Sequence, residues 1–379
     1  MLSLHAQDKK IMFNPVTTSV TSQSIAPDAR GGAMGDLGAA TDPDVSSQYW
    51  NPAKYPFCIG RAGVAVNYTP WLRQLVNDIN LAYVSGFYRI GDYQALSASL
   101  RYFSLGEVST SSTDDGTGDM TISPYEMSVD VAYSRMLSEN FSAAVALRFI
   151  LSDITYDYSD ETSPGKAFAA DIALYWNRYF TGRTREWNMG IGLNISNIGS
   201  KISYGGDDNS EFIPTNLRLG VNFLIPINEY NKFSIDGLMP MNAFGCDLSE
   251  TERRRGRSGL YGSCTAGLLR YIPYCRYFSR VSVMLPRFLR RNAEIQWSMG
   301  LEYIYNDRFS LRAGLPSRER KQGKPQVFSP WEPVFRMSVF SLDAGYVFST
   351  AQSNPLDQTM RFTLGFDLDG MKDLFGRRR

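Results

Sequence analysis

Strict alternation of apolar and polar residues recurs along most of this chain, and it constrains the fold more than any other feature of the sequence. From Trp187 to Ser196, apolar residues occupy every second position, and Asn, Gly or Ser occupies the positions between them. The stretches 295–305 and 360–368 follow the same rule. Residues two apart lie on one face of a β-strand, so each stretch predicts a strand with one apolar and one polar face.

The same pattern predicts about fourteen strands. They are expected near residues 60–68, 79–89, 94–105, 125–137, 140–156, 168–179, 187–204, 215–227, 232–244, 294–305, 308–316, 333–340, 342–349 and 358–368. Their connections alternate between tight turns, as at 91–92 and 306–307, and long polar loops, as at 106–124 and 245–293. Such alternation is typical of outer-membrane barrels. We therefore predict an all-β fold, a transmembrane antiparallel β-barrel of about fourteen strands with an N-terminal plug segment.

Charged and amide residues on the polar strand faces indicate what the barrel encloses. They are Asp130, Arg148, Asp171, Asn194, Arg218, Glu302, Arg312, Asp343 and Arg361. A charge in a dry core is costly unless it is paired, so we expect a lumen that holds water or a plug that pairs with these groups. The alternative is a large soluble β-sandwich or propeller, which gives no reason for short and long connections to alternate.

Composition excludes several classes of function. The chain of 379 residues has 39 Lys and Arg against 38 Asp and Glu, so its net charge does not predict nucleic-acid binding. The only histidine is His5, and the four cysteines form no CxxC pair, which argues against a zinc site. No catalytic residue set or phosphate-binding loop is recognisable. We expect a protein that is not an enzyme and has no cofactor and no bound metal.

The residues before the first predicted strand lack regular alternation. Residues 1–7 are interpreted as a signal-peptide remnant, with an ordinary terminus as the alternative, and residues 8–57 as a lead-in and plug. The barrel is predicted over 58–370 and a basic tail over 371–379. A short helix is expected between Pro43 and Lys54, capped by Asp42. The candidate plug residues are Pro27, Asp28, Arg30, Gly31, Gly32, Gly35, Asp36, Asp42, Trp50, Asn51 and Pro52.

Two roles for this plug are considered. Its glycines permit tight turns, and its charged residues can pair with each other or with the lumen. The plug could therefore be purely structural, or its contacts could be mobile and gate the barrel.

The long predicted loop 245–293 combines positive charge with apolar residues. Its candidate partner-binding residues are Arg253, Arg254, Arg255, Tyr271, Tyr274, Tyr277 and Phe278. The arginines could contact lipopolysaccharide or an acidic partner, or could serve only solubility. So much apolar surface predicts a loop that folds over the barrel mouth or meets a partner. Cys246, Cys264 and Cys275 lie in the same region, either as a disulfide and a thiol or as free thiols.

Two motifs resemble known families. Asn51-Pro52-Ala53, shortly before the first predicted strand, is similar to FadL-type outer-membrane proteins, which share an N-terminal plug and about fourteen strands. A longer pattern resembles the PorV (LptO) family, the outer-membrane component of the type IX secretion system of Bacteroidota. It comprises Ser24–Asp36, Ala40–Asp44 and Gln48–Lys54, with further similarity at Trp297–Asp307, Leu311–Gly314, Pro355, Leu356 and Thr359–Leu364. The insert 245–293 departs from the family pattern.

This resemblance implies a non-enzymatic role in protein export. PorV-like proteins receive exported proteins with C-terminal signal domains from an SprA-like translocon barrel. They deliver this cargo to a PorU-type attachment complex, where it is linked to surface lipopolysaccharide. The expected partners are therefore that translocon, the cargo, the attachment complex and outer-membrane lipid or lipopolysaccharide, with no nucleic acid. Two alternatives are a FadL-like carrier of hydrophobic small molecules and a structural barrel that seals the side of the translocon.

Overall fold

The computed structural model describes residues 18–73, 76, 78–111, 119–154, 163–182, 185–204, 210–242, 297–317, 332–336, 339–347 and 359–369. Three features predicted from the sequence lie outside these residues: the signal-peptide remnant 1–7, the loop 245–293 with all its candidate partner residues, and the basic tail 371–379. In the part of the chain that is described, no helix combines the length and apolar character needed to cross a membrane.

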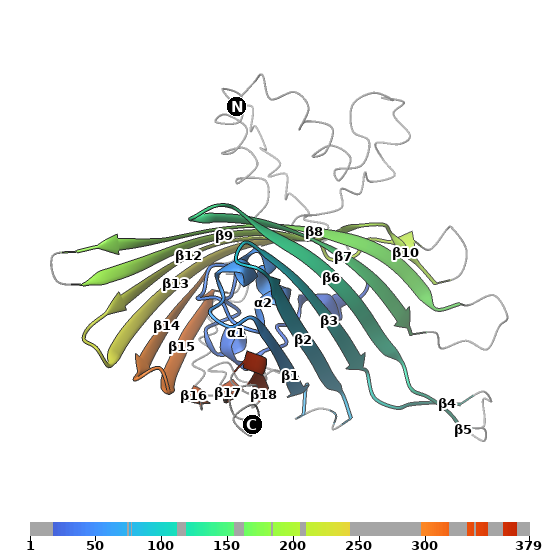
Figure 1. Cartoon of the computed structure of the whole chain (residues 1–379). Helices are drawn as coiled ribbons and strands as arrows, with labels where there is room; N and C mark the ends of the chain where they lie inside the picture. Colours follow the sequence, from blue (N-terminus) through green and yellow to red (C-terminus); the bar gives the residue numbers. More distant parts are fainter. Residues whose placement is uncertain are drawn as a thin grey trace, which may run out of the picture.

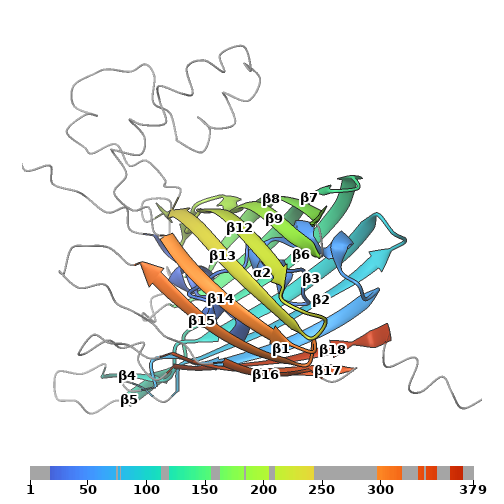
Figure 2. The same ribbon diagram turned by 90° about the vertical axis from the view of Figure 1, so that its left-hand side faces the viewer.

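Fourteen of the described strands form a closed antiparallel barrel around the N-terminal segment (Figures 1 and 2). Each strand pairs with its neighbours in chain order, and β1 pairs with both β2 and β18, which closes the ring. The wall strands are β1 (Ala62–Pro70), β2 (Asn80–Ile90), β3 (Gln94–Ser104), β6 (Tyr125–Ser138), β7 (Phe141–Asp153), β8 (Gly165–Thr181), β9 (Glu186–Gly199), β12 (Asn216–Pro226), β13 (Asn231–Asn242), β14 (Trp297–Tyr305), β15 (Phe309–Ser317), β16 (Glu332–Arg336), β17 (Phe340–Val347) and β18 (Thr359–Asp367). Closure leaves no free sheet edge along the ring.

The strand pattern read from the sequence is confirmed, because the predicted segments overlap the fourteen wall strands one for one in chain order. The largest difference is at β9, which was expected to continue to residue 204 and ends at Gly199. Asn197 has a φ of 60°, and the pairing of β8 with β9 shifts between Ala170 and Ile172. The Asp171 carboxylate accepts a hydrogen bond from the Asn197 backbone N–H at 2.7 Å. This bulge shifts the register, and the pairing then continues only to Gly199.

The two ends of the barrel have different connections. Tight turns at 91–93, 139–140, 227–230 and 306–308 lie at one end, which we call the periplasmic end. The long connections lie at the other, external end. Two of them contain small hairpins that the sequence did not predict: β4 (Val108–Ser111) with β5 (Asp119–Ile122), and β10 (Ile202–Ser203) with β11 (Ser210–Glu211).

The outer and inner faces of the wall differ as the alternation predicts. Apolar side chains such as Val66, Leu100, Val131 and Leu147 are exposed on the outside. Every predicted polar-face residue, from Asp130 to Arg361, is instead buried. Aromatic residues lie near both ends of the outer face, among them Tyr68, Tyr102, Tyr88, Tyr133 and Tyr305. This arrangement matches a lipid-facing band between two aromatic girdles.

Four short helical elements lie inside the barrel before β1 (Figure 1). They are the 3-10 helix η1 (Thr21–Ser24), the α-helices α1 (Ala29–Ala33) and α2 (Ser47–Trp50), and the 3-10 helix η2 (Pro52–Phe57). The expected helix between Pro43 and Lys54 is therefore shorter. It begins at Ser47, and Asp42 does not cap it. We use the name plug for residues 18–61.

Candidate functional site

The plug fills the lumen with polar as well as apolar contacts. Nine of the eleven candidate plug residues are buried, Asp42 is partly buried, and Asp36 is exposed. Most of the buried plug residues contact strands that are far away in the sequence. The site is therefore the contact surface between the plug and the lumen wall, built from the residues described below.

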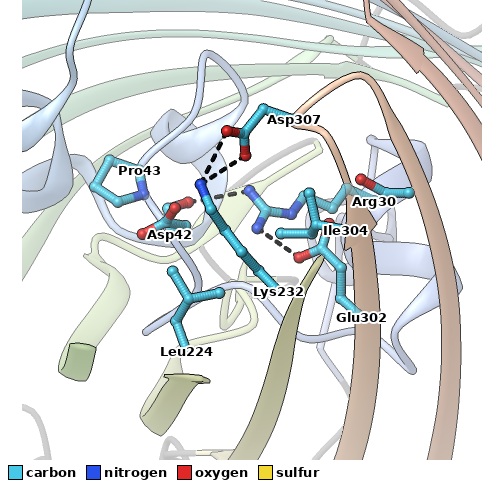
Figure 3. A pocket seen from close by; sticks show the side chains of 9 residues that line it. Arg30, Asp42, Pro43, Leu224, Lys232, Glu302, Ile304 and Asp307 are labelled. Carbon is cyan, nitrogen blue, oxygen red and sulfur yellow. Dashed lines mark hydrogen bonds and ion pairs between the residues drawn. The ribbon is translucent and has the colours of Figure 1, made fainter. Parts of the chain in front are cut away.

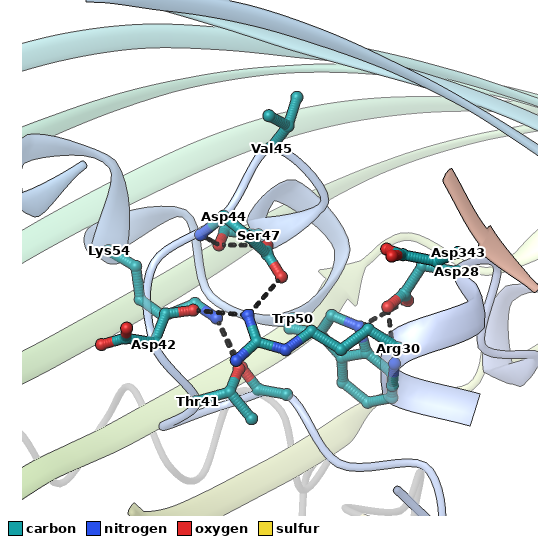
Figure 4. A network of polar contacts seen from close by, with 12 residues as sticks. Asp28, Arg30, Thr41, Asp42, Asp44, Val45, Ser47, Trp50, Lys54 and Asp343 are labelled. Atoms are coloured by element: carbon teal, nitrogen blue, oxygen red, sulfur yellow. Dashed lines mark hydrogen bonds and ion pairs between the residues drawn. The ribbon is translucent and has the colours of Figure 1, made fainter. Parts of the chain in front are cut away.

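Asp28 organises the start of the plug (Figure 4). Its carboxylate caps α1 by accepting a hydrogen bond from the Gly31 N–H at 2.7 Å, and it accepts a second from the Trp50 indole N–H at 2.7 Å. Burial raises the pKa of Asp28, as does the nearby charge of Asp44. The two donated hydrogen bonds oppose that rise, since they stabilise the ionised form. Asp28 thus joins α1 to α2 across the plug.

Arg30 joins the plug to the wall. Its guanidinium donates to the Asp44 carboxylate at 2.9 Å within the plug and to the Glu302 carboxylate on β14 at 3.0 Å. Glu302 also accepts from Arg312 on β15 at 2.7 Å. The Arg30 guanidinium further donates to the Asp42 backbone carbonyl at 3.1 Å. These ion pairs and hydrogen bonds offset the desolvation cost that burial of the Arg30 charge carries.

Lys54 is completely buried, which is rare for a lysine. Its ammonium donates to the Gly38 carbonyl at 2.8 Å and to the Thr41 hydroxyl at 3.0 Å (Figure 4). Burial lowers the pKa of Lys54, although the negative charge of Asp44 opposes this. For Asp44, burial raises the pKa, but the positive charges of Lys54 and Arg30 outweigh it and the pKa is lowered overall. Lys54 therefore holds the loop between α1 and α2 in place.

Asn51 and Trp50 attach the plug to β8 and β9. The Asn51 amide donates to the Ala39 carbonyl at 2.9 Å and to the Leu174 carbonyl at 3.0 Å. The Asn194 amide on β9 donates to the Trp50 carbonyl at 2.7 Å. The Asn51 side chain also accepts from the Ala53 N–H, which starts η2. The Asn-Pro-Ala motif thus has a structural role: it ends α2, begins η2 and binds the wall.

Arginines of the wall hold the aromatic residues of α2. Arg218 on β12 donates to the Tyr49 hydroxyl at 3.0 Å and lies 5.3 Å from the Trp50 ring. Arg101 on β3 lies 5.1 Å from the Tyr49 ring and donates to the Ser22 carbonyl at 2.6 Å. Through these cation–π contacts, the wall arginines pack against the aromatic rings of Tyr49 and Trp50 in the plug.

Strand glycines let the plug backbone approach the wall closely. A Cβ on Gly192 of β9 would lie 1.8 Å from the Ala39 carbonyl oxygen. A Cβ on Gly314 of β15 would lie 2.0 Å from the Met34 carbonyl carbon. Both distances are far shorter than any van der Waals contact, so only glycine fits these positions without moving the plug.

A second cluster of charges ties α2 to the wall strands. Arg148 on β7 lies 3.3 Å from the Asp130 carboxylate and 2.9 Å from the Asp171 carboxylate. Asp130 also accepts from the Ser99 hydroxyl at 2.8 Å and from the Gln48 amide of the plug. Most of the lumen charges predicted from the sequence are therefore paired, either with another wall residue or, as for Glu302 and Arg361, with a charge of the plug. Arg218 instead donates hydrogen bonds to Tyr49.

At the external end, the plug begins beside the connection between β9 and β12. The Ser19 N–H donates to the Phe212 carbonyl at 3.0 Å, and the Ser19 hydroxyl contacts the Tyr204 hydroxyl at 2.8 Å. Val20 packs against Ile150 and Ile202 in an apolar cluster. The plug thus runs through the lumen from the external end to β1, which starts at the periplasmic end.

One small cavity lies at the periplasmic end beside Arg30 (Figure 3). Its volume is about 80 Å³, and it is lined by Arg30, Asp42, Pro43, Leu224, Lys232, Glu302, Ile304, Asp307 and Ser310. Lys232 and Asp307 form an exposed ion pair at 2.7 Å beside it. Charged groups dominate this lining, so the cavity suits water or a small polar species.

The described residues carry no recognisable catalytic or metal chemistry. Among them, no group of three or more His, Cys, Asp or Glu residues could hold a metal ion. Cys58 is a buried free thiol whose pKa is raised by burial, which makes it unreactive.

Sequence reasoning found much of this contact surface and missed some of it. The structure brings together Asp28 with Trp50, and Arg30 with Glu302. Asp36 lies apart from the core of the plug, 3.5 Å from Arg361. Sequence reasoning did not single out Lys54 or Asp44, although Lys54 is completely buried and Asp44, which is partly buried, forms an ion pair with Arg30. The available signal was that both residues lie in the plug motif, close in sequence to the charged residues Arg30 and Asp42.

A model of the family described as "Type IX secretion system protein PorV" matches residues 6–240 of the sequence, which is more than half of the chain. The match ends just before the insert at 245–293, the part expected to depart from the family. None of the curated proteins matches the sequence significantly.

Solved structures of outer-membrane barrels resemble the fold. A TodX deltaS2S3 mutant monoaromatic hydrocarbon channel has a TM-score of 0.51 and 11% identity, covering 89% of this chain and 96% of that one. A Pseudomonas aeruginosa FadL homologue has a TM-score of 0.41 and 11% identity, covering 90% and 98%. CdiB from Acinetobacter baumannii has a TM-score of 0.43 and 10% identity. The match covers 81% of this chain and 60% of CdiB. At such identities, the likeness to the TodX mutant shows the barrel fold alone.

Proposed function

Because the chain belongs to the PorV family of type IX secretion system proteins and is an outer-membrane β-barrel, we propose that it is a non-enzymatic shuttle for exported proteins. It receives cargo that bears a C-terminal signal domain from the translocon barrel, and it delivers this cargo to the cell-surface attachment complex. The translocon, the cargo, the PorU-type attachment complex and surface lipopolysaccharide are its proposed partners.

The filled lumen is the observation that supports this proposal best. The plug is held on opposite sides of the wall, by Glu302 of β14 through Arg30 and by Arg101 of β3 through the Ser22 carbonyl. Such contacts leave the interior of the barrel occupied by the chain itself. A folded partner therefore has to bind at an end of the barrel or on its outer wall, and the long connections lie at the external end.

The alternative, a FadL-like carrier of hydrophobic small molecules, needs an apolar chamber. Pockets for drug-sized ligands usually measure about 300–1,000 Å³ and are mostly apolar. The cavity at the periplasmic end measures about 80 Å³ and is lined by Arg30, Glu302 and other charged residues. The size and charged lining of this cavity do not suit a lipid-sized apolar ligand.

Capture of exported proteins tests the proposed function. The tagged barrel, purified from cells that express a type IX cargo protein, is expected to retain the cargo only when its C-terminal domain is intact. We expect at least about tenfold less cargo after truncation, because removal of the domain takes away the whole interface. The bound protein is quantified by mass spectrometry.

Two further arms distinguish the alternatives. Deletion of residues 245–293 should reduce capture while the barrel keeps its heat-dependent gel mobility, if the candidate partner residues there bind the cargo. Unchanged capture would exclude that loop as the cargo-binding site, and it would not contradict the proposed shuttle function. Absence of capture together with a long-chain fatty acid bound in the lumen would instead support the carrier.

A further inference from the structure

An exposed arginine lies in an aromatic patch on the outer wall, near the periplasmic end. Arg178 is on β8, three residues before the strand ends at Thr181. It lies an even number of positions from Ile172 and Trp176, so it shares their lipid-facing side of the strand. The neighbouring residue Asn177 points into the lumen, where its amide oxygen accepts a hydrogen bond from Asn188 at 2.6 Å. Among the described residues, no carboxylate lies within ion-pair distance of Arg178.

Rings from three adjacent strands form a patch that begins beside this arginine. The Arg178 guanidinium carbon lies 5.3 Å from the centre of the Phe180 ring. Phe180 stacks on Trp187 of β9 with centroids 4.3 Å apart and planes 13° apart. Trp176 and Phe223 extend the patch, at 6.4 Å from Phe180 and Trp187 respectively. The Phe180 ring therefore packs against the guanidinium on the outer face of the wall.

A guanidinium at this level of a membrane barrel is well placed to bind an anion. Aromatic girdles lie at the headgroup level of a bilayer, where lipid phosphates are found. Arginine binds phosphate through two parallel charge-assisted hydrogen bonds, and its planar face remains free to stack on a ring. The rings would also cover the upper part of the lipid acyl chains, so one patch offers both kinds of contact that a phospholipid requires.

From this geometry we propose that Arg178, Phe180, Trp176 and Trp187 form a binding site for the phosphate headgroup of a periplasmic-leaflet phospholipid. The site is independent of cargo binding and lies on the opposite end of the barrel from the long connections. A carboxylate of a neighbouring barrel is the other conceivable anion. The exposure of Arg178 at headgroup level, beside apolar lipid-facing residues, favours the lipid.

Arg135 provides a matched control. It is an exposed arginine on the outer face of β6, also three residues before its strand ends, at Ser138. Among the described residues, cation–π contacts involve Arg101, Arg178, Arg218 and Lys201, and not Arg135. A difference between the two arginines therefore reports the aromatic patch and not positive charge alone.

The test uses the full chain reconstituted with phosphatidylglycerol, re-extracted in mild detergent and analysed by native mass spectrometry. Arg178→Gln is expected to lower the retained phosphatidylglycerol about tenfold, because the charge-assisted hydrogen bonds are lost. Arg135→Gln is expected to retain it within about twofold, since no built site is removed. Phe180→Leu keeps the charge and is expected to lower retention less than Arg178→Gln, which separates stacking from the ion pair.

Several outcomes would overturn the proposal. Equal retention by the wild type and Arg178→Gln, or equal losses for Arg178→Gln and Arg135→Gln, would show that the patch does not select the lipid. Loss of an associated barrel on native gels with unchanged lipid retention would assign Arg178 to a protein partner. Both variants must show wild-type heat-dependent gel mobility; if Arg178→Gln does not fold, Phe180→Leu decides by itself, and full retention in that variant contradicts the site.

Discussion

Replacing Gly192 with alanine is expected to loosen the plug more than any other single-methyl change in the wall. The new Cβ would lie 1.8 Å from the Ala39 carbonyl oxygen and 2.9 Å from the Asn51 amide nitrogen. Both neighbours are held by hydrogen bonds, so neither can move without breaking contacts of the plug. Overpacking of this kind costs about 1–3 kcal/mol, and a clash with backbone belongs at the upper end.

The buried thiol of Cys58 measures this loosening. In a chain whose other three cysteines are replaced by alanine, Cys58 should react with a maleimide about 100-fold faster in the Gly192→Ala variant, if labelling follows local opening of the plug. Gly237→Ala on β13 is the matched control, because its Cβ would meet nothing within 4 Å. Equal labelling rates for Gly192→Ala and Gly237→Ala would show that the plug backbone does not approach β9 as closely as described.

Removing the guanidinium of Arg30 is expected to have an effect of similar size through charge. Arg30→Met leaves Glu302 paired only with Arg312 and removes the 2.9 Å contact to Asp44. Loss of one partner of a buried ion pair costs about 3–5 kcal/mol, and the remaining Arg312 keeps the expected cost near the lower value. The same Cys58 labelling and the temperature at which heat-dependent gel mobility changes measure the loss.

Lys232→Gln controls for charge removal near the same cavity. The Lys232–Asp307 pair is at 2.7 Å, but its side chains are 33% and 63% exposed. Exposed pairs contribute less than about 1 kcal/mol, so this variant should behave almost as the wild type. The double variant Arg30→Met with Glu302→Gln should lose less than the two single losses combined, because the two groups interact directly. Additive losses, or equal effects of Arg30→Met and Lys232→Gln, would exclude Arg30 as the link between plug and wall.

The sequence predicts the wall of this protein far better than its plug. Alternation repeats over nine or more residues in most strands, which is enough to reveal β9 and β18 directly. The helix α1 has only five residues, two of them glycine, and thus carries no helical periodicity. It forms because Asp28 caps it and the wall encloses it, and neither cause is visible as a repeating pattern.

The pairing of charges could be predicted only in general terms. Buried charges in a closed barrel require partners, so the expectation that the plug supplies them followed from physics. The individual partners could not be predicted. Glu302 binds Arg30, which is 272 positions away in the sequence, and Asp130 binds Gln48, which is 82 positions away. The wall glycines could likewise be predicted only in part. The alternation places Gly192 in a strand, but it does not reveal that the plug backbone contacts this residue.

The central claim is that cargo binds to a barrel whose plug stays in place, and a disulfide between plug and wall tests it most directly. A Cβ on Gly345 would lie 3.7 Å from the Ala29 Cβ, within the usual range of about 3.5–4.5 Å for disulfides. In a chain without its four native cysteines, Ala29→Cys with Gly345→Cys should therefore lock α1 to β17. We expect the oxidised barrel to capture cargo with an intact C-terminal domain as well as the reduced barrel does. Capture that appears only after reduction would mean that the plug has to move, and would contradict the account.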